Sequence, residues 1–114
     1  MNVIILPEIL EYLDDLVFIL FEKGYFNYLE TSQRYVDELF DDINTTLPVR
    51  SKKPAPKRFD RYGKGMYYAS FIKNKHTTWY VFFKMYKVNE ELVYQVRYIA
   101  NNHTIAKHLE HFSS

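Results

Sequence analysis

The sequence predicts a single α+β domain, residues 1–114, in which an N-terminal strand and a two-helix hairpin pack on a three- to four-stranded antiparallel sheet. Apolar residues recur at helical spacing in the first half of the chain, and aromatic and β-branched residues dominate the second half. Prolines separate the two halves. With 114 residues, 47% of them hydrophobic, the chain is near the common size for one hydrophobic core.

The N-terminal residues predict a short strand that leads directly into a helix. The β-prone run at 2–6 stops at Pro7, which suits the first turn of a helix because its missing N–H would be unpaired there. Glu8 favours the helix dipole, and Gly24 supplies a C-terminal stop. We therefore expect a helix over about 7–23, and its core side consists of Ile9, Leu13, Leu16, Val17 and Leu20.

A second helix is expected to run to about Thr46. Asn27 followed by Glu30 resembles a capping box, which predicts that the helix begins there. A three-residue connection between the helices predicts a helical hairpin whose apolar stripes face a common core. The second stripe consists of Tyr28, Tyr35, Val36, Leu39, Phe40 and Ile43.

Three strands are expected in the second half of the chain, over 66–73, 78–87 and 92–100. Strict alternation in the last strand separates two faces, so the register decides whether Arg97 is exposed. A short terminal helix is expected over 105–112. The two faces of the last strand are Val93, Gln95, Arg97 and Ile99 on one side, and Tyr94, Val96, Tyr98 and Ala100 on the other.

The basic segment, residues 50–64, carries seven of the fifteen lysines and arginines of the chain. Pro48, Pro54 and Pro56 predict that it is a non-helical connection. Residues 1–47 contain ten acids and two bases, a net charge of −8, whereas residues 48–114 contain thirteen bases and four acids, a net charge of +9. This asymmetry favours an anionic partner for the second half. The alternative is that the two halves neutralise each other in the fold.

Several classes of site are excluded or disfavoured by composition. The absence of cysteine excludes disulfides, thiolate metal sites and cysteine nucleophiles. The longest apolar run, at 16–21, is far short of the ~20 residues that cross a bilayer, and no signal-peptide pattern precedes it. We therefore expect a cytoplasmic protein without a membrane partner. His108 and His111 lack a further ligand nearby, so no metal or other cofactor is expected.

The order of strand, helix, helix, basic connection and antiparallel strands resembles the RelE/ParE family of bacterial type II toxins, as does the ending Tyr98-Ile99-Ala100-Asn101-Asn102-His103. The resemblance covers nearly the whole chain as topology. It implies a helical hairpin on an antiparallel sheet with basic residues around a concave face. It also implies metal-independent mRNA cleavage on the ribosome, as in RelE-like members, or inhibition of DNA gyrase, as in ParE-like members. A cognate antitoxin holds both kinds inactive.

The resemblance can be carried to individual residues. His103 matches a position just past the last strand that RNase members often fill with His, Tyr or Arg. One departure lies in the stretch 78–83, which is rich in aromatics and contains no arginine where family nucleases commonly carry one; Lys84 or Arg97 would have to substitute. The basic connection is matched by Lys52, Lys53, Lys57, Arg58 and Arg61.

Cleaving RNA without a metal requires a base, an acid and a cation near one phosphate. A histidine titrates near neutral pH, so His103 is the candidate acid or base; its structural alternative is a C-terminal cap. Lys53 or Lys57 would act as a base only if desolvation or the neighbouring cations favoured its neutral form. The candidate catalytic residues are His103, Arg61, Arg97 and Lys57, and the candidate RNA-binding residues are Lys52, Lys53, Arg58, Lys64 and Tyr67.

Aromatic residues next to these cations have two interpretations. They stack on RNA bases, or they pack in the half-buried positions that tyrosine commonly occupies. On the first helix, Phe18 falls on the same side as acidic residues, so the resemblance makes it a candidate antitoxin-binding residue. The leading function is a ribosome-associated mRNA endoribonuclease. The alternatives are a non-enzymatic gyrase inhibitor and a catalytically silent partner-binding domain.

Overall fold

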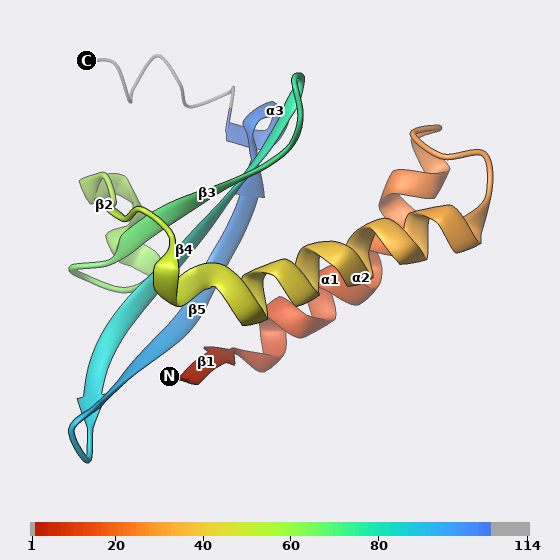
Figure 1. Cartoon of the computed structure of the whole chain (residues 1–114). Coiled ribbons are helices and arrows are strands. Elements are labelled where there is room, and N and C mark those ends of the chain that lie inside the picture. Colours follow the sequence, from red (N-terminus) through yellow and green to blue (C-terminus); the bar gives the residue numbers. More distant parts are fainter. Residues whose placement is uncertain (1, 106–114) are drawn as a thin grey trace.

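The computed structural model describes residues 2–105 of the chain, and it confirms the predicted α+β class. Two helices lie on one face of a five-stranded sheet, and the 3₁₀ helix within the basic segment lies on the other side (Figure 1). The predicted helix over 105–112 lies almost wholly outside the described residues. The elements are β1 (Asn2–Ile5), α1 (Pro7–Glu22), α2 (Leu29–Thr46), η1 (Leu47–Val49), β2 (Lys53–Pro54), η2 (Lys57–Tyr62), β3 (Tyr67–Asn74), β4 (Thr77–Val88), β5 (Glu91–Asn101) and α3 (Asn102–Ile105).

The sheet has the strand order β1-β5-β4-β3-β2 and is mixed. Strands β2 to β5 pair antiparallel along the chain, and short turns join β3 to β4 and β4 to β5. Strand β1 instead pairs parallel with β5, from Asn2 opposite Val93 to Ile5 opposite Val96. The expected antiparallel sheet is therefore extended at both edges, by β1 on one side and by the two-residue β2 on the other.

The main core lies between the helices and the sheet. The five apolar residues predicted for the core side of α1 are all buried, and they meet Val36, Leu39 and Ile43 of α2. Ser32 is fully buried at the crossing of the helices, and its Oγ donates a 2.5 Å hydrogen bond to the Val17 carbonyl. Within residues 2–105, no helix combines the length and the apolar composition of a membrane span.

The predicted capping box of α2 is wrong. The helix begins at Leu29, and its N-cap residue is Tyr28, whose side chain makes no capping hydrogen bond. Tyr28 is 67% exposed and does not belong to the apolar stripe. The connection between the helices is consequently longer than expected, and Gly24 begins it with φ at +82°. In the same connection, the ring of Phe26 packs on Tyr35 of α2 with ring centroids 5.3 Å apart.

The predicted strict alternation in the last strand is also wrong, because a β-bulge interrupts it. Phe82 pairs with Tyr98 and Phe83 with Val96, so Arg97 is the extra residue. The bulge shifts the faces by one position. Ile99 therefore shares the helix-facing core with Val96, whereas Tyr98 and Ala100 belong to a second cluster on the opposite face.

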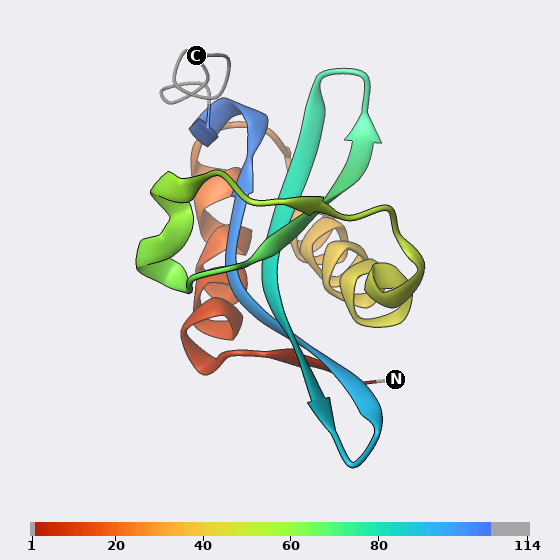
Figure 2. The ribbon, with the colours of Figure 1, turned by 90° about the vertical axis from the view of Figure 1, so that its left-hand side faces the viewer.

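The basic segment is not a simple non-helical connection. It follows η1, pairs briefly with β3 through β2, and then forms the 3₁₀ helix η2. Pro56 precedes η2 with extended backbone angles, which fits the preference of proline for positions that start a helical turn. In Figure 2 the segment crosses in front of the sheet from β3 towards β5. The prolines therefore lie in the short turns of the basic segment. These turns place its cations over the face of the sheet that α1 and α2 do not cover.

Candidate nucleic-acid interface

Aromatic stacking fixes the basic segment to the helix-free face of the sheet. The ring of Phe59 stacks on Phe82 of β4 with centroids 4.4 Å apart. The ring of Tyr62 stacks on Tyr98 of β5 at 4.1 Å and 8°. Met66 and Ala100 are buried in the same cluster. Such aromatic pairs contribute roughly 0.5–1.5 kcal/mol each beyond their buried area. The segment is thus held at two points, one over β4 and one over β5.

Arg97 supplies a polar link between the sheet and the same segment. Its Nε donates a 2.6 Å hydrogen bond to the Tyr62 carbonyl. Its Nη1 donates to Gln95 Oε1 and, at 3.4 Å, to the Tyr86 hydroxyl. Gly63 follows at φ +152°, and a Cβ there would come within 2.9 Å of Arg97 Nε. The guanidinium therefore acts as a clamp on the end of η2, which makes Arg97 a positioning residue in this arrangement.

Five cations of the basic segment remain exposed above this anchored layer. Among the described residues, the only ion pair joins Arg50 to Asp42, at 2.9 Å. Within residues 2–105 the acidic helices therefore neutralise only Arg50 of the segment through a direct pair, although the charges of the two halves nearly cancel in sum. Exposed cations at this density attract phosphate backbones. The exposed cations are Lys53, Lys57, Arg58, Arg61 and Lys64.

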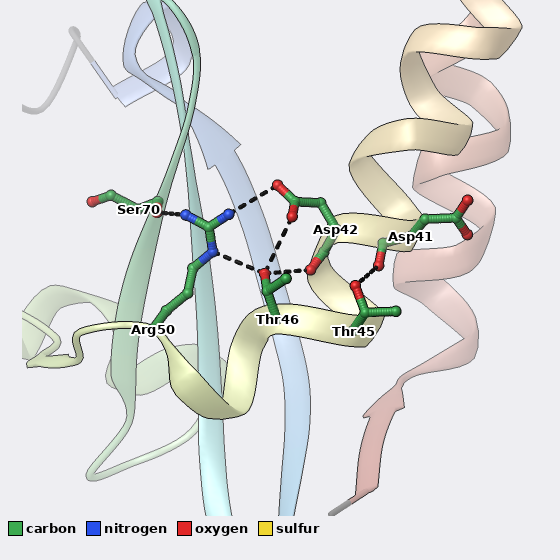
Figure 3. A network of polar contacts seen from close by, with 6 residues as sticks. All are labelled: Asp41, Asp42, Thr45, Thr46, Arg50 and Ser70. Carbon is green, nitrogen blue, oxygen red and sulfur yellow. Dashed lines mark hydrogen bonds and ion pairs between the residues drawn. The ribbon is translucent and has the colours of Figure 1, made fainter.

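Arg50 differs from these cations because its guanidinium is used inside the fold (Figure 3). Its Nε donates to Thr46 Oγ1 at 3.0 Å, and its Nη1 donates to the Ser70 carbonyl at 3.1 Å. It also lies 3.8 Å from the centroid of the Phe71 ring. Arg50 therefore joins the end of α2 to β3 and fixes the point where the basic segment begins.

Lys52 is likewise engaged within the protein. Its Nζ donates to the carbonyls of Pro48 and Arg50 at 2.9 and 2.7 Å, and it lies 5.4 Å from the Tyr94 ring centroid. Because of these contacts, Lys52 is not counted among the exposed cations.

Tyr67 is the one predicted RNA contact that lies outside the basic segment. It begins β3 and is 36% exposed.

His103 lies at the far end of β5, in α3. The side chain of Asn102 fixes this turn, because its Oδ1 accepts from Thr78 N–H and its Nδ2 donates to the His76 carbonyl, each at 3.0 Å. His103 lines a cavity between α1 and β5 that Tyr98 also lines. The structure does not bring His103 into contact with the clamp formed by Arg97. Among residues 2–105 no three His, Asp or Glu side chains gather as metal ligands would.

Tyr98 is the residue that the two parts of the candidate site share. Burial raises its pKa above 10.0, and the nearby Tyr62 hydroxyl raises the pKa further, whereas the charge of Arg61 lowers it. Arg61 also lies 5.0 Å from the Tyr62 ring centroid. Arg61 therefore lies near Tyr98, whose side chain lines the same cavity as His103. Lys57 and Arg58 lie earlier in η2 and are exposed.

Phe18 lies on the outer side of α1, where 55% of its side chain is exposed. Glu11, Asp15 and Glu22 are exposed on the same helix, as predicted from their spacing. This face lies opposite the buried residues of α1, so it is separate from the basic segment on the other side of the sheet (Figure 1).

Sequence reasoning missed the structural roles of Arg50 and Arg97. The spacing of Asp42, Thr46 and Arg50, four residues apart each time, is a local signal that would have found the first network. No comparable signal reveals the contact of Arg97 with Tyr62, because the bulge that aims Arg97 depends on packing between strands. Comparisons of the chain with protein-family models, with curated proteins and with solved structures found no match.

Proposed function

We propose that this protein is the toxin of a bacterial type II toxin–antitoxin system, similar to the RelE/ParE family, and that it cuts mRNA on the ribosome in the cytoplasm without a metal. The observation that carries the proposal is the group of exposed cations on a segment that aromatic packing anchors to the face of the sheet opposite α1 and α2. Cations on an anchored segment bind a phosphate backbone at a smaller entropic cost than cations on a solvated loop do.

Within this proposal, the cations of η2 bind the RNA backbone. Arg61 stabilises the charge that develops on the phosphate as the 2′-hydroxyl attacks and the 5′-oxygen leaves. His103 accepts or donates the proton, with Lys57 as the second candidate for this role. The remaining candidate contacts, Lys53, Arg58, Lys64 and Tyr67, hold the strand. Arg97 acts indirectly, because its hydrogen bond to the Tyr62 carbonyl positions Arg61 one residue away.

One observation favours the non-enzymatic alternative, a ParE-like inhibitor of DNA gyrase. The guanidinium of Arg97 already bonds to Tyr62, Gln95 and Tyr86, and His103 lines a separate cavity. A partner-binding protein needs the exposed cations but no convergent acid and base. The same reasoning applies to a catalytically silent binding domain.

The proposed antitoxin contact is the outer face of α1 around Phe18. An exposed aromatic side chain flanked by carboxylates favours a partner helix with an apolar stripe and basic edges. Phe18→Ala should weaken antitoxin binding at least about tenfold, a typical cost for an aromatic anchor. Glu8→Ala, on the same helix, is the matched control. An unchanged dissociation constant for the Phe18 variant would exclude this face.

Induction of the protein in bacteria tests the enzymatic proposal. Growth should stop and ribosome-bound mRNA should shorten, while Arg61→Ala and His103→Ala should each restore growth. Lys75→Ala, in the turn between β3 and β4, serves as the control and should leave the arrest intact. Intact mRNA during arrest would reject cleavage. Failed supercoiling by purified gyrase in the presence of the protein would then favour the alternative.

A further inference from the structure

Two adjoining cavities lie where the helical hairpin meets the end of the sheet. The larger, about 540 Å³, opens between α1 and the last residues of β5. The smaller, about 300 Å³, lies between the helices and the β3–β4 hairpin, and Trp79 contributes to its wall. Four residues line both cavities: Leu20, Tyr25, Asn101 and His103. These shared residues make the two cavities adjoining parts of one recess, and Tyr98 in its wall links the recess to the anchored face of the basic segment.

The larger cavity has an apolar floor and a polar rim. Ile9, Leu16 and Ile99 are buried and belong to the main core, so the floor is rigid. Lys23 and Tyr25 are exposed at the rim. An apolar recess of roughly 300–1,000 Å³ with a few polar groups is the usual form of a small-molecule site. Its size and lining therefore suit a small ligand better than a macromolecular segment.

The charged residues around the recess indicate whether a bound ligand would be anionic or cationic. Among residues 2–105, no aspartate or glutamate lines either cavity, although residues 1–47 contain ten acids. Lys23 is one of only two bases in that half of the chain, and it lies at the rim. Tyr12 also lines the cavity, and burial raises its pKa to about 12, with a further contribution from the nearby Tyr98. Its hydroxyl therefore remains a hydrogen-bond donor at neutral pH.

We propose that the larger cavity binds a small apolar carboxylate, whose hydrocarbon body lies on the floor formed by Ile9, Leu16 and Ile99 and whose carboxylate pairs with Lys23. This site goes beyond the proposed toxin function, since it requires neither RNA nor an antitoxin. It also touches the candidate interface, because Tyr98 lines the cavity and stacks on Tyr62. A bound carboxylate would therefore contact one of the two anchors of the basic segment.

Titration calorimetry with three ligands of equal chain length tests the proposal on the full-length protein. Decanoate, 1-decanol and decyltrimethylammonium share the apolar body and differ in the charge of the head group. Decanoate should bind most tightly. Lys23→Gln should weaken decanoate binding about fivefold, the upper range for a partly exposed ion pair, and should leave 1-decanol binding unchanged. Lys23→Arg should retain decanoate binding, and Lys75→Gln, which lines neither cavity, should behave as the unaltered protein.

A second variant tests the wall of the cavity independently of charge. Ile19 lines the cavity and is 38% exposed, so Ile19→Ala leaves the buried core intact. It should weaken decanoate and 1-decanol alike. Thermal melts of each variant verify that the fold is retained. Absence of decanoate binding, equal affinity for all three head groups, or loss of 1-decanol binding in Lys23→Gln would each overturn the proposal. So would decanoate binding that appears only after residues 106–114 are deleted, because the chain itself would then be the occupant.

Discussion

The Nε of Arg97 donates a 2.6 Å hydrogen bond to the backbone carbonyl of Tyr62, and this bond ties the bulged strand β5 to the end of η2. A further contact restrains the region around each of these two residues. The Tyr62 ring stacks on Tyr98, and Gly63 presses against the Arg97 guanidinium. The bulge in β5 and the turn after η2 are therefore one structural unit, which sets the position of the exposed cations on the preceding turns.

Substitution of Gly63 tests this unit. Gly63→Ala should lower the free energy of unfolding by about 2–3 kcal/mol, because φ is +152° and the new Cβ meets Arg97 Nε at 2.9 Å. Gly65→Ala is the matched control: its φ is +70°, but nothing lies within 4 Å of the added Cβ, so about 1 kcal/mol is expected. Urea denaturation measures both. Equal losses for the two variants would show that the contact with Arg97 carries no energy.

The network around Arg50 should couple the end of α2 to the sheet. Both side chains of the Arg50–Asp42 pair are about one third exposed, so a double-mutant cycle should give a coupling free energy of only about 0.5–1 kcal/mol. Arg50→Ala alone should cost more, about 2 kcal/mol, since the bonds to Thr46 and the Ser70 carbonyl are lost as well. Arg58→Ala, an exposed cation of the same segment, should change the unfolding free energy little. Equal effects of the two alanine variants would contradict this assignment.

Stability should fall at high pH because of Tyr12. Burial and the neighbouring Tyr98 raise its folded-state pKa from 10.0 to about 12. Between these values the unfolded chain loses the proton and the folded protein keeps it, so ionisation favours unfolding as pH rises. Full stability is therefore retained below pH 10, and the loss of unfolding free energy reaches about 2 kcal/mol at pH 12. Comparison of chemical denaturation at pH 9 and 11 measures it. Tyr12→Phe should show a shallower loss, and an identical slope would exclude Tyr12 as the cause.

The elements with strong local signals were predictable from the sequence. Pro7 marks the start of α1, and the spacing of Leu13, Leu16 and Leu20 identifies its buried side. The strands β3, β4 and β5 follow from their aromatic and β-branched residues. These features depend on residues within a few positions of one another, so they can be predicted from a single sequence.

The features that position the candidate site were not predictable in the same way. The bulge at Arg97 depends on which residues of β4 it opposes, and strict alternation gave the wrong face for Ile99. The capping pattern of Asn27 and Glu30 predicted the wrong start for α2, which begins at Leu29. The stacking of Tyr62 on Tyr98 joins residues far apart in the chain. Tertiary packing determines each of these three features, and the spacing of residues along the chain does not indicate them.

The central claim is that the exposed cations of the basic segment bind an RNA backbone. Fluorescence anisotropy with a labelled single-stranded RNA, measured over a series of salt concentrations, tests it most directly. The double variant Arg58→Ala/Arg61→Ala should bind more weakly, and the slope of log K against log salt should fall by about 1.4, since each phosphate contact on a single strand contributes about 0.7. The control Lys75→Ala/Lys87→Ala removes the same charge from the β3–β4 turn and the end of β4, outside the segment, and should retain the original slope. Equal slopes for the protein and the double variant would contradict the account.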